Sequence, residues 1–243
     1  MRKLWLLLPA LAGIAAAAPG LTGKQVMDRL RDVTSARDRK ATAVMTITDR
    51  SKRVQSRKMR MVMKGDAKMM MTFETPADLR GVTFMTSSVD NMWIYLPAQG
   101  RVRRISGSMA EQGFGGSDFS YKEMANISFS DEAGVEQMTE CDVDGRAAYR
   151  LDLKDEAGEK SRLWVEKERF LPMQLEKLGS DNKPTKRVLF SEFESRDSSW
   201  VPALIVMQDL SRGSTTELKL EKLELNTGVR DNLFTESNMK KGA

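Results

Sequence analysis

Residues 58–76 read KMRMVMKGDAKMMMTFETP, and this stretch decides the fold class. Apolar side chains occupy alternate positions in each half of it, at Met59, Met61 and Met63 and then at Met69, Met71 and Phe73. Side chains two residues apart lie on the same face of a strand. With a turn at Gly65 and Asp66 between the halves, the stretch predicts two antiparallel strands that share one apolar face.

The same period of two continues from Ala41 to Leu225, interrupted by glycine, aspartate and asparagine. Interruptions of this kind every 10–15 residues or so are typical of a barrel or a strongly curved sheet. The pattern predicts about ten or eleven strands in a curved antiparallel sheet that forms a half-open barrel.

One amphipathic helix is expected before the strands, within residues 22–40. Val26, Met27, Leu30 and Val33 recur there at spacings of three and four, and Thr22 is placed to cap the helix. Short helices are expected near residues 121–126 and 231–238. Helices do not alternate with strands, so the fold class is mainly β (α+β) rather than parallel α/β.

The N-terminus resembles a secretory signal peptide. Basic residues at Arg2 and Lys3 precede an apolar run from Leu4 to Ala18 that ends in alanines. We expect cleavage before Ala18, which leaves a single domain at 18–243; an uncleaved anchor is the alternative. Cys141 is the only cysteine, so the cleavage point offers no thiol for lipid attachment and the exported chain is expected not to be lipidated.

Composition argues against several classes of function. The formal net charge is +5, and removal of Arg2 and Lys3 lowers it to +3, too little to indicate nucleic-acid binding. The chain has no histidine, which excludes Ser-His-Asp and Cys-His catalysis and removes a common metal ligand. We therefore expect no enzyme activity, no catalytic residues, no cofactor and no metal site.

Three separated segments carry a resemblance to a known family. They are MTFETPADLRGVTF at 71–84, MWIYLPAQGRVRRISGS at 92–108 and GSDFSYKEM at 116–124. In this order and spacing they resemble outer-membrane lipoprotein-sorting proteins, the LolA-like superfamily. The resemblance implies a half-open barrel wrapped over helices, an apolar cavity for lipid or lipoprotein acyl chains, and a periplasmic location. It also implies an inner-membrane donor and an outer-membrane acceptor.

The apolar faces of the predicted strands suggest which residues line a cavity. The candidates are Met45, Ile47, Met61, Met63, Met71, Phe73, Phe84, Trp93, Tyr95 and Leu151. Flexible thioethers could adapt to acyl chains of different shape. The alternative is that the methionines are core residues packed under the first helix. A non-enzymatic envelope adaptor with a filled core, and a Cu(I)-handling protein that uses methionine sulfur, remain alternative functions.

A basic and glycine-rich region from 101 to 116 suggests the mouth of such a cavity. The candidates are Arg101, Arg103, Arg104 and Phe114. Alternation places Arg101 and Arg103 on one face, where they could meet an anionic head group or an acidic protein surface. Equally, their charge could protect an exposed strand from edge pairing. The glycines at 107–116 predict a mobile loop, with a lid as the alternative.

Overall fold

The computed structural model describes residues 20–88, 90–127, 133–196 and 198–241. The predicted signal peptide at 1–17 lies outside these residues. Within them no helix is long and apolar enough to span a lipid bilayer.

The described residues form thirteen strands in one antiparallel sheet. In chain order the strands are β1 (Asp38–Thr48), β2 (Val54–Lys64), β3 (Lys68–Thr75), β4 (Thr83–Ser88), β5 (Asn91–Leu96), β6 (Arg101–Ile105), β7 (Gly134–Val143), β8 (Arg146–Lys154), β9 (Lys160–Glu166), β10 (Pro172–Leu178), β11 (Pro184–Arg196), β12 (Ser199–Asp209) and β13 (Ser214–Leu225). The α-helices are α1 (Gly23–Thr34), α2 (Tyr121–Ala125) and α3 (Glu236–Lys241), and short 3-10 turns are η1 (Pro97–Gln99), η2 (Gly107–Met109), η3 (Phe114–Gly116) and η4 (Asp231–Leu233).

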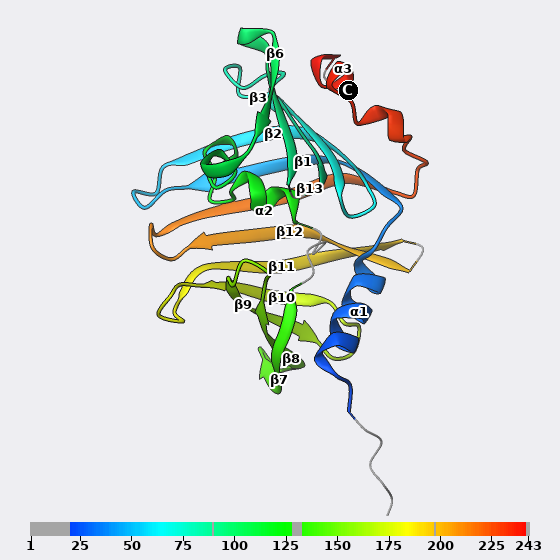
Figure 1. The fold of residues 1–243 in the computed structure, drawn as a ribbon, viewed down its shortest axis with the longest axis vertical. Helices are drawn as coiled ribbons and strands as arrows, with labels where there is room; N and C mark the ends of the chain where they lie inside the picture. Colours follow the sequence, from blue (N-terminus) through cyan, green and yellow to red (C-terminus); the bar gives the residue numbers. More distant parts are fainter. Residues whose placement is uncertain (1–19, 89, 128–132, 197, 242–243) are drawn as a thin grey trace, which may run out of the picture.

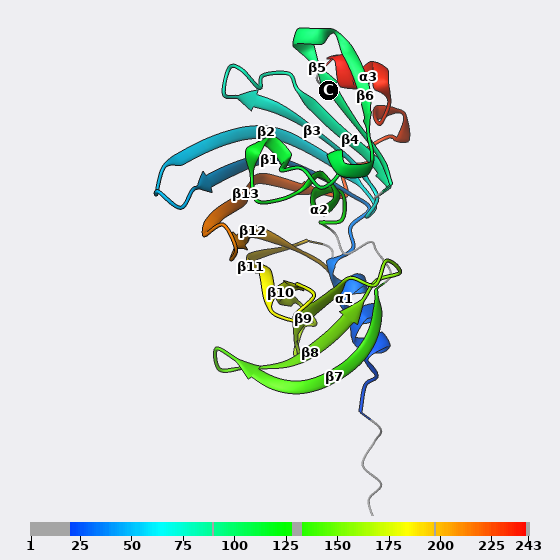
Figure 2. The ribbon, with the colours of Figure 1, turned by 60° about the vertical axis from the view of Figure 1, so that its left-hand side comes forward.

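The sheet is a continuous meander that does not close. Its order runs β6-β5-β4-β3-β2-β1-β13-β12-β11-β10-β9-β8-β7, so β1 and β13 pair in the middle while β6 and β7 are the two edges. Figures 1 and 2 show the sheet curved around α1 and α2. The predicted half-open barrel is confirmed. The sheet has thirteen strands, more than the ten or eleven expected.

The two faces of the sheet are distinguished by what covers them. We call the face under α1 and α2 the inner face, and the face under α3 the outer face. The helix α1 begins at Thr22, whose side chain forms a capping box with Gln25. It ends at Thr34 rather than near residue 40, since Asp38 already begins β1. Its buried residues Val26 and Leu30 pack on the inner face of β8 and β9.

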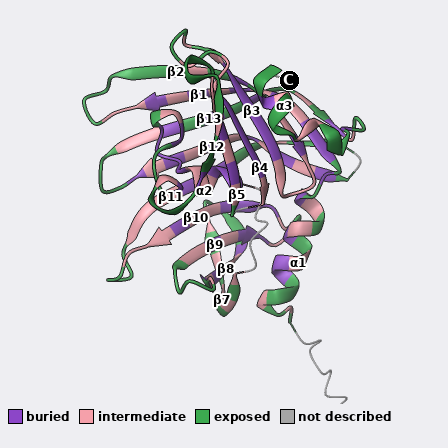
Figure 3. Cartoon of the chain, turned by 45° about the horizontal axis from the view of Figure 1, so that its top comes forward, coloured by how far each residue is buried: buried purple, intermediate pink, exposed green. Residues whose placement is uncertain are grey.

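Residues 106–127, here called the plug, fill the inner face of β1–β6. Phe114, in η3, lies in ring contact with Phe73 and Phe84, with centroids 5.4 Å apart in each case. The predicted loop is therefore packed, not open, and Phe114 is only 1% exposed. Gly115 has a φ of +57°, and a Cβ there would lie 2.9 Å from the Phe73 ring, so the close approach requires glycine. Figure 3 shows buried positions gathered along β3, β4 and β5, whereas the turn between β1 and β2 and the start of β2, residues 50–56, are exposed.

Candidate functional site

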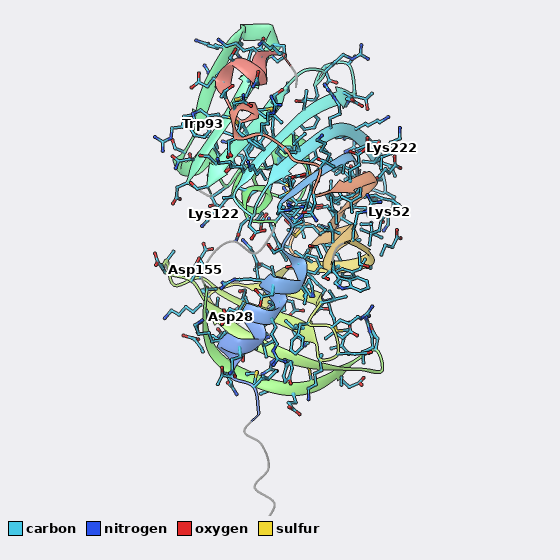
Figure 4. The ribbon with its side chains drawn as sticks, turned by 90° about the vertical axis from the view of Figure 1, so that its right-hand side faces the viewer. Asp28, Lys52, Trp93, Lys122, Asp155 and Lys222 are labelled. Carbon is cyan, nitrogen blue, oxygen red and sulfur yellow. The ribbon has the colours of Figure 1, made fainter. Side chains whose placement is uncertain are left out.

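A pocket of about 590 Å³ lies between α1, the plug and the inner face of β8–β12, partly open to solvent. Its apolar wall includes Met27, Phe119, Leu153, Val188, Phe190 and Met207. Its charged rim includes Lys122, Glu123, Asp155, Lys160, Lys177 and Lys186. Figure 4 shows Lys122, on α2, and Asp155, in the β8–β9 turn, on the same side of the molecule, one above the other. The pocket thus combines an apolar interior with a charged entrance.

Strand register explains why the interior is apolar and the entrance charged. Leu175 on β10 pairs with Val188 on β11, which pairs with Met207 on β12. Two residues nearer the β10–β11 turn, Lys177 pairs with Lys186. Residues two apart on a strand share a face. The apolar row of Leu175, Val188 and Met207 is therefore followed, on the same face, by a second row that begins with the two lysines.

Glu123 of α2 lies between these two lysines. Its carboxylate is 3.2 Å from the Lys177 ammonium and 2.8 Å from that of Lys186. It also accepts a hydrogen bond of 2.7 Å from the backbone N–H of Ser120, which completes a capping box at the start of α2. Burial alone would raise the pKa of Glu123, but the two lysines and the hydrogen bonds outweigh it and hold the pKa below its ordinary value.

A second carboxylate, Asp118, fixes the plug to the β12–β13 hairpin. The side chain of Asp118 is buried and accepts hydrogen bonds from Arg212 at 2.8 Å, Ser214 at 2.5 Å and Thr216 at 2.8 Å. The hydroxyl of Thr216 in turn accepts from the backbone N–H of Asp118 at 3.0 Å. The bond to Asp118 raises the pKa of Arg212, which keeps the guanidinium charged. Charged contacts therefore hold both ends of the segment 118–123 against the sheet.

The structure divides the predicted cavity residues among three places, and within the described chain none of the ten lines the pocket. Seven lie on the inner face beneath the plug, namely Met45, Ile47, Met61, Met63, Met71, Phe73 and Phe84. Leu151 packs under α1. Trp93 and Tyr95 pack on the outer face with Met70, Met85 and Met239, the last from α3. The methionines beneath the plug thus occupy core positions, covered by the plug instead of by the first helix.

Trp93 packs on the outer face because side chains alternate along β5. Met92 and Ile94 belong to the inner cluster with Phe84, so the residues between them must face the other way. Figure 4 shows Trp93 well away from Lys122 and Asp155. The triple methionine at residues 69–71, which could offer thioether sulfur to Cu(I), is divided in the same way, because Met69 and Met71 face inward and Met70 faces outward.

The predicted mouth residues also separate. Arg101 and Arg103 pair with Leu96 and Ile94 and so project on the side of the inner face, as alternation predicts. Arg104 pairs with Trp93 on the outer side, where it donates to the Asn91 side chain at 3.1 Å. All three are exposed on the edge strand β6. In the described residues none of them, nor buried Phe114, lines the pocket.

Replacement of both Arg101 and Arg103 with glutamate is expected to weaken binding of cargo or partner without unfolding the protein. Both side chains are exposed, so the free energy of unfolding should change by no more than about 0.5 kcal/mol. Arg104→Glu, which reverses a charge on the other side of the strand, is the matched control. Cargo transfer that the double replacement leaves unchanged would show that these two arginines bind neither cargo nor partner.

Lys177 and Lys186 were not predicted as site residues, because the sequence around them shows little that marks a binding site. Lys177 and Lys186 alternate with Leu175 and Val188, which marks amphipathic strands but not a shared site. Their meeting with Glu123 depends on the plug, whose course across the inner face is set by contacts far apart in sequence.

Solved structures with the same fold were found in three bacteria. A domain described as an outer membrane lipoprotein-sorting protein, from Vibrio parahaemolyticus, has a TM-score of 0.77 and 24% identity, covering 89% of this chain and 96% of its own. A DUF1329 family protein from Desulfovibrio piger has a TM-score of 0.78 and 25% identity over 88% and 96%. A LolA superfamily protein from Nitrosomonas europaea has a TM-score of 0.76 and 16% identity over 90% and 99%.

Comparison by sequence adds a family assignment. No curated protein matches the chain. A family model whose description reads "Uncharacterized protein" matches residues 65–241. The chain belongs to that family, and it shares its fold with the Vibrio domain described as a lipoprotein-sorting protein and with the LolA superfamily protein.

Proposed function

We propose that this protein is a non-enzymatic periplasmic carrier that binds lipid, or the acyl chains of lipoproteins, in the pocket between α1, the plug and the inner face. It passes this cargo from an inner-membrane donor toward an outer-membrane acceptor. The observation that carries the proposal is the pocket itself, with its apolar wall and charged rim. The LolA-like fold supports the same function.

The size and lining of the pocket suit an acyl chain. Its volume of about 590 Å³ lies within the range of roughly 300–1,000 Å³ that small-molecule pockets occupy. Each methylene moved from water into an apolar site contributes roughly 0.8 kcal/mol. Ten methylenes would then contribute about 8 kcal/mol, before the cost of ordering the chain. One chain is enough for useful binding.

Release follows from the same energetics. Cargo held by burial of apolar surface leaves when an acceptor offers a more favourable site. The carrier works by differences in affinity along its route.

The direct test is native mass spectrometry, with lipid extraction, of protein purified from the periplasm without detergent. We expect a stoichiometric lipid or acylated polypeptide to accompany the protein. Preparations that are empty and also fail to take up a fluorescent fatty acid would favour the adaptor, an alternative suggested by the filled inner face beneath the plug.

A tryptophan inserted in the pocket is expected to abolish uptake of the fluorescent fatty acid while leaving the fold intact. Leu175 lines the pocket from β10 and is only partly buried, so Leu175→Trp fills volume that cargo would occupy. Leu189→Trp on β11 is the matched control, because Leu189 is also partly buried but lies on the outer face between Gln174 and Val206. Equal uptake by both variants would place the cargo elsewhere.

A further inference from the structure

The charged rim points to the head group of the cargo, and this step rests on the proposed function. Lys177 and Lys186 lie directly opposite each other on neighbouring strands, on the same face, at the entrance of the pocket. Two ammonium groups in that position repel each other unless an anion lies between them. In this structure the anion is the carboxylate of Glu123.

We infer that Lys177 and Lys186 form a binding site for the anionic head group of an amphiphile, carboxylate or phosphate, and that Glu123 occupies this site in the present structure. Glu123 thereby acts as an internal competitor. A cargo with its chain along the apolar wall of the pocket would bring its head to the rim, where it meets these two lysines.

The contacts of the lysines support exchange of one anion for another. Their side chains are 36% and 23% exposed, so an incoming head group can reach them. Lys186 also donates to the carbonyl oxygen of Asp118 at 2.8 Å, which orients its ammonium group. Carboxylates and phosphates both accept short, strong hydrogen bonds from ammonium groups.

Exchange at this site also acts on the plug. Glu123 caps α2 through the Ser120 N–H, and its two ion pairs tie α2 to β10 and β11. An anion that displaces the carboxylate removes these ties while the Asp118 contacts remain. Head-group binding is therefore coupled to loosening of α2 at the edge of the pocket.

The test uses Glu123→Gln, which keeps an acceptor for the Ser120 N–H because glutamine also serves in a capping box. The variant removes the competing charge and leaves the two lysines without their anion. We expect palmitate and hexadecyl phosphate to bind at least about tenfold more tightly to this variant than to the unmodified protein. Hexadecanol, with the same chain and no charge, should bind the two proteins equally.

The lysines are tested in the same background. Lys177→Met and Lys186→Met, combined with Glu123→Gln, should abolish the gain for both anionic probes. Lys160→Met and Glu111→Gln are matched controls, because both residues line the same pocket and Lys160 bonds to the Asn182 side chain instead of to Glu123. Calorimetry below the micellar concentration of each probe measures the dissociation constants, and a gain limited to one anion identifies the head group as carboxylate or phosphate.

The outcomes separate this inference from the proposed function. If all three probes bind the pocket but Glu123→Gln changes none of their affinities, the head-group site is wrong and the lipid carrier stands. If no probe binds any variant in the pocket, both are wrong. A gain for hexadecanol equal to that for palmitate would also overturn the head-group site, since it would indicate only a wider entrance.

Discussion

Asp118→Ala is expected to lower the free energy of unfolding by about 3 kcal/mol, or roughly 6–12 °C in the unfolding midpoint. The substitution removes a buried acceptor of three side-chain hydrogen bonds, and it leaves the hydroxyl of Thr216, itself fully buried, without an acceptor for its own hydrogen. Thermal unfolding followed by circular dichroism measures the loss.

The same substitution should loosen the plug before the sheet unfolds. With Asp118 gone, the segment that carries Phe119 and Tyr121 loses its attachment to the β12–β13 hairpin, and binding of a hydrophobic dye should rise. Arg212→Ala is the control. Its side chain is 61% exposed, and its removal leaves Ser214 and Thr216 bonded to Asp118, so we expect a loss below about 1 kcal/mol. An unchanged midpoint for Asp118→Ala would show that the Asp118 side chain does not hold the plug to the sheet.

Asp38→Ala is expected to release the C-terminal segment from the outer face. Asp38 is buried at the start of β1, where it accepts hydrogen bonds from the backbone N–H groups of Thr227, Gly228 and Val229 and from the Thr227 hydroxyl. We expect a loss of about 3 kcal/mol in the free energy of unfolding. Amide exchange across residues 227–241 should accelerate, and fluorescence of Trp93, which packs near Met239 of α3, should shift toward that of exposed tryptophan.

The effect of Asp38 should depend on pH in a defined direction. Burial by itself raises its pKa, but the bonds from Thr227, Gly228 and Val229 outweigh burial and hold the pKa below its ordinary value. A group with a depressed folded pKa stabilises fully above its unfolded pKa, about 3.9 for aspartate, and loses that contribution as pH falls through the folded value. As pH falls below about 3.9, the unmodified protein should therefore lose the part of its free energy of unfolding that Asp38 contributes. The Asp38→Ala variant lacks this carboxylate and should not show that loss. Parallel acid-unfolding curves for the two proteins would contradict this.

Alternation in the sequence was sufficient to predict the strands and, in most cases, their faces. Met59, Met61 and Met63 face inward because the period of two is a property of the strand itself. It failed to place Trp93 and Tyr95, because residues 92–95 are apolar at every position. An apolar residue on the outer face needs a cover, and α3 provides that cover from the far end of the chain.

The packing of the plug could not be predicted, because glycine occurs both in open, mobile loops and where the backbone packs closely against a side chain. Glycines at 107–116 are consistent with an open loop, but at Gly115 the missing Cβ allows the backbone to approach Phe73 closely. The pocket has the same difficulty. Its lysines belong to two strands, its carboxylate to a short helix and its apolar wall to several elements, so only the folded chain brings them together.

The pairing of β1 with β13 has a consequence for how the chain folds. Strands β1–β6 follow one another in sequence, as do β7–β13, so each half of the sheet can assemble from contacts between neighbours along the chain. The junction between β1 and β13 joins the two halves and must close the longest loop in the sheet. Until residues 214–225 reach β1, each half presents an extra unpaired edge beside an apolar face, which is the hazard that leads to aggregation. The seam in the middle of the sheet, and not its open ends, is the place where a folding catalyst or chaperone would protect this protein.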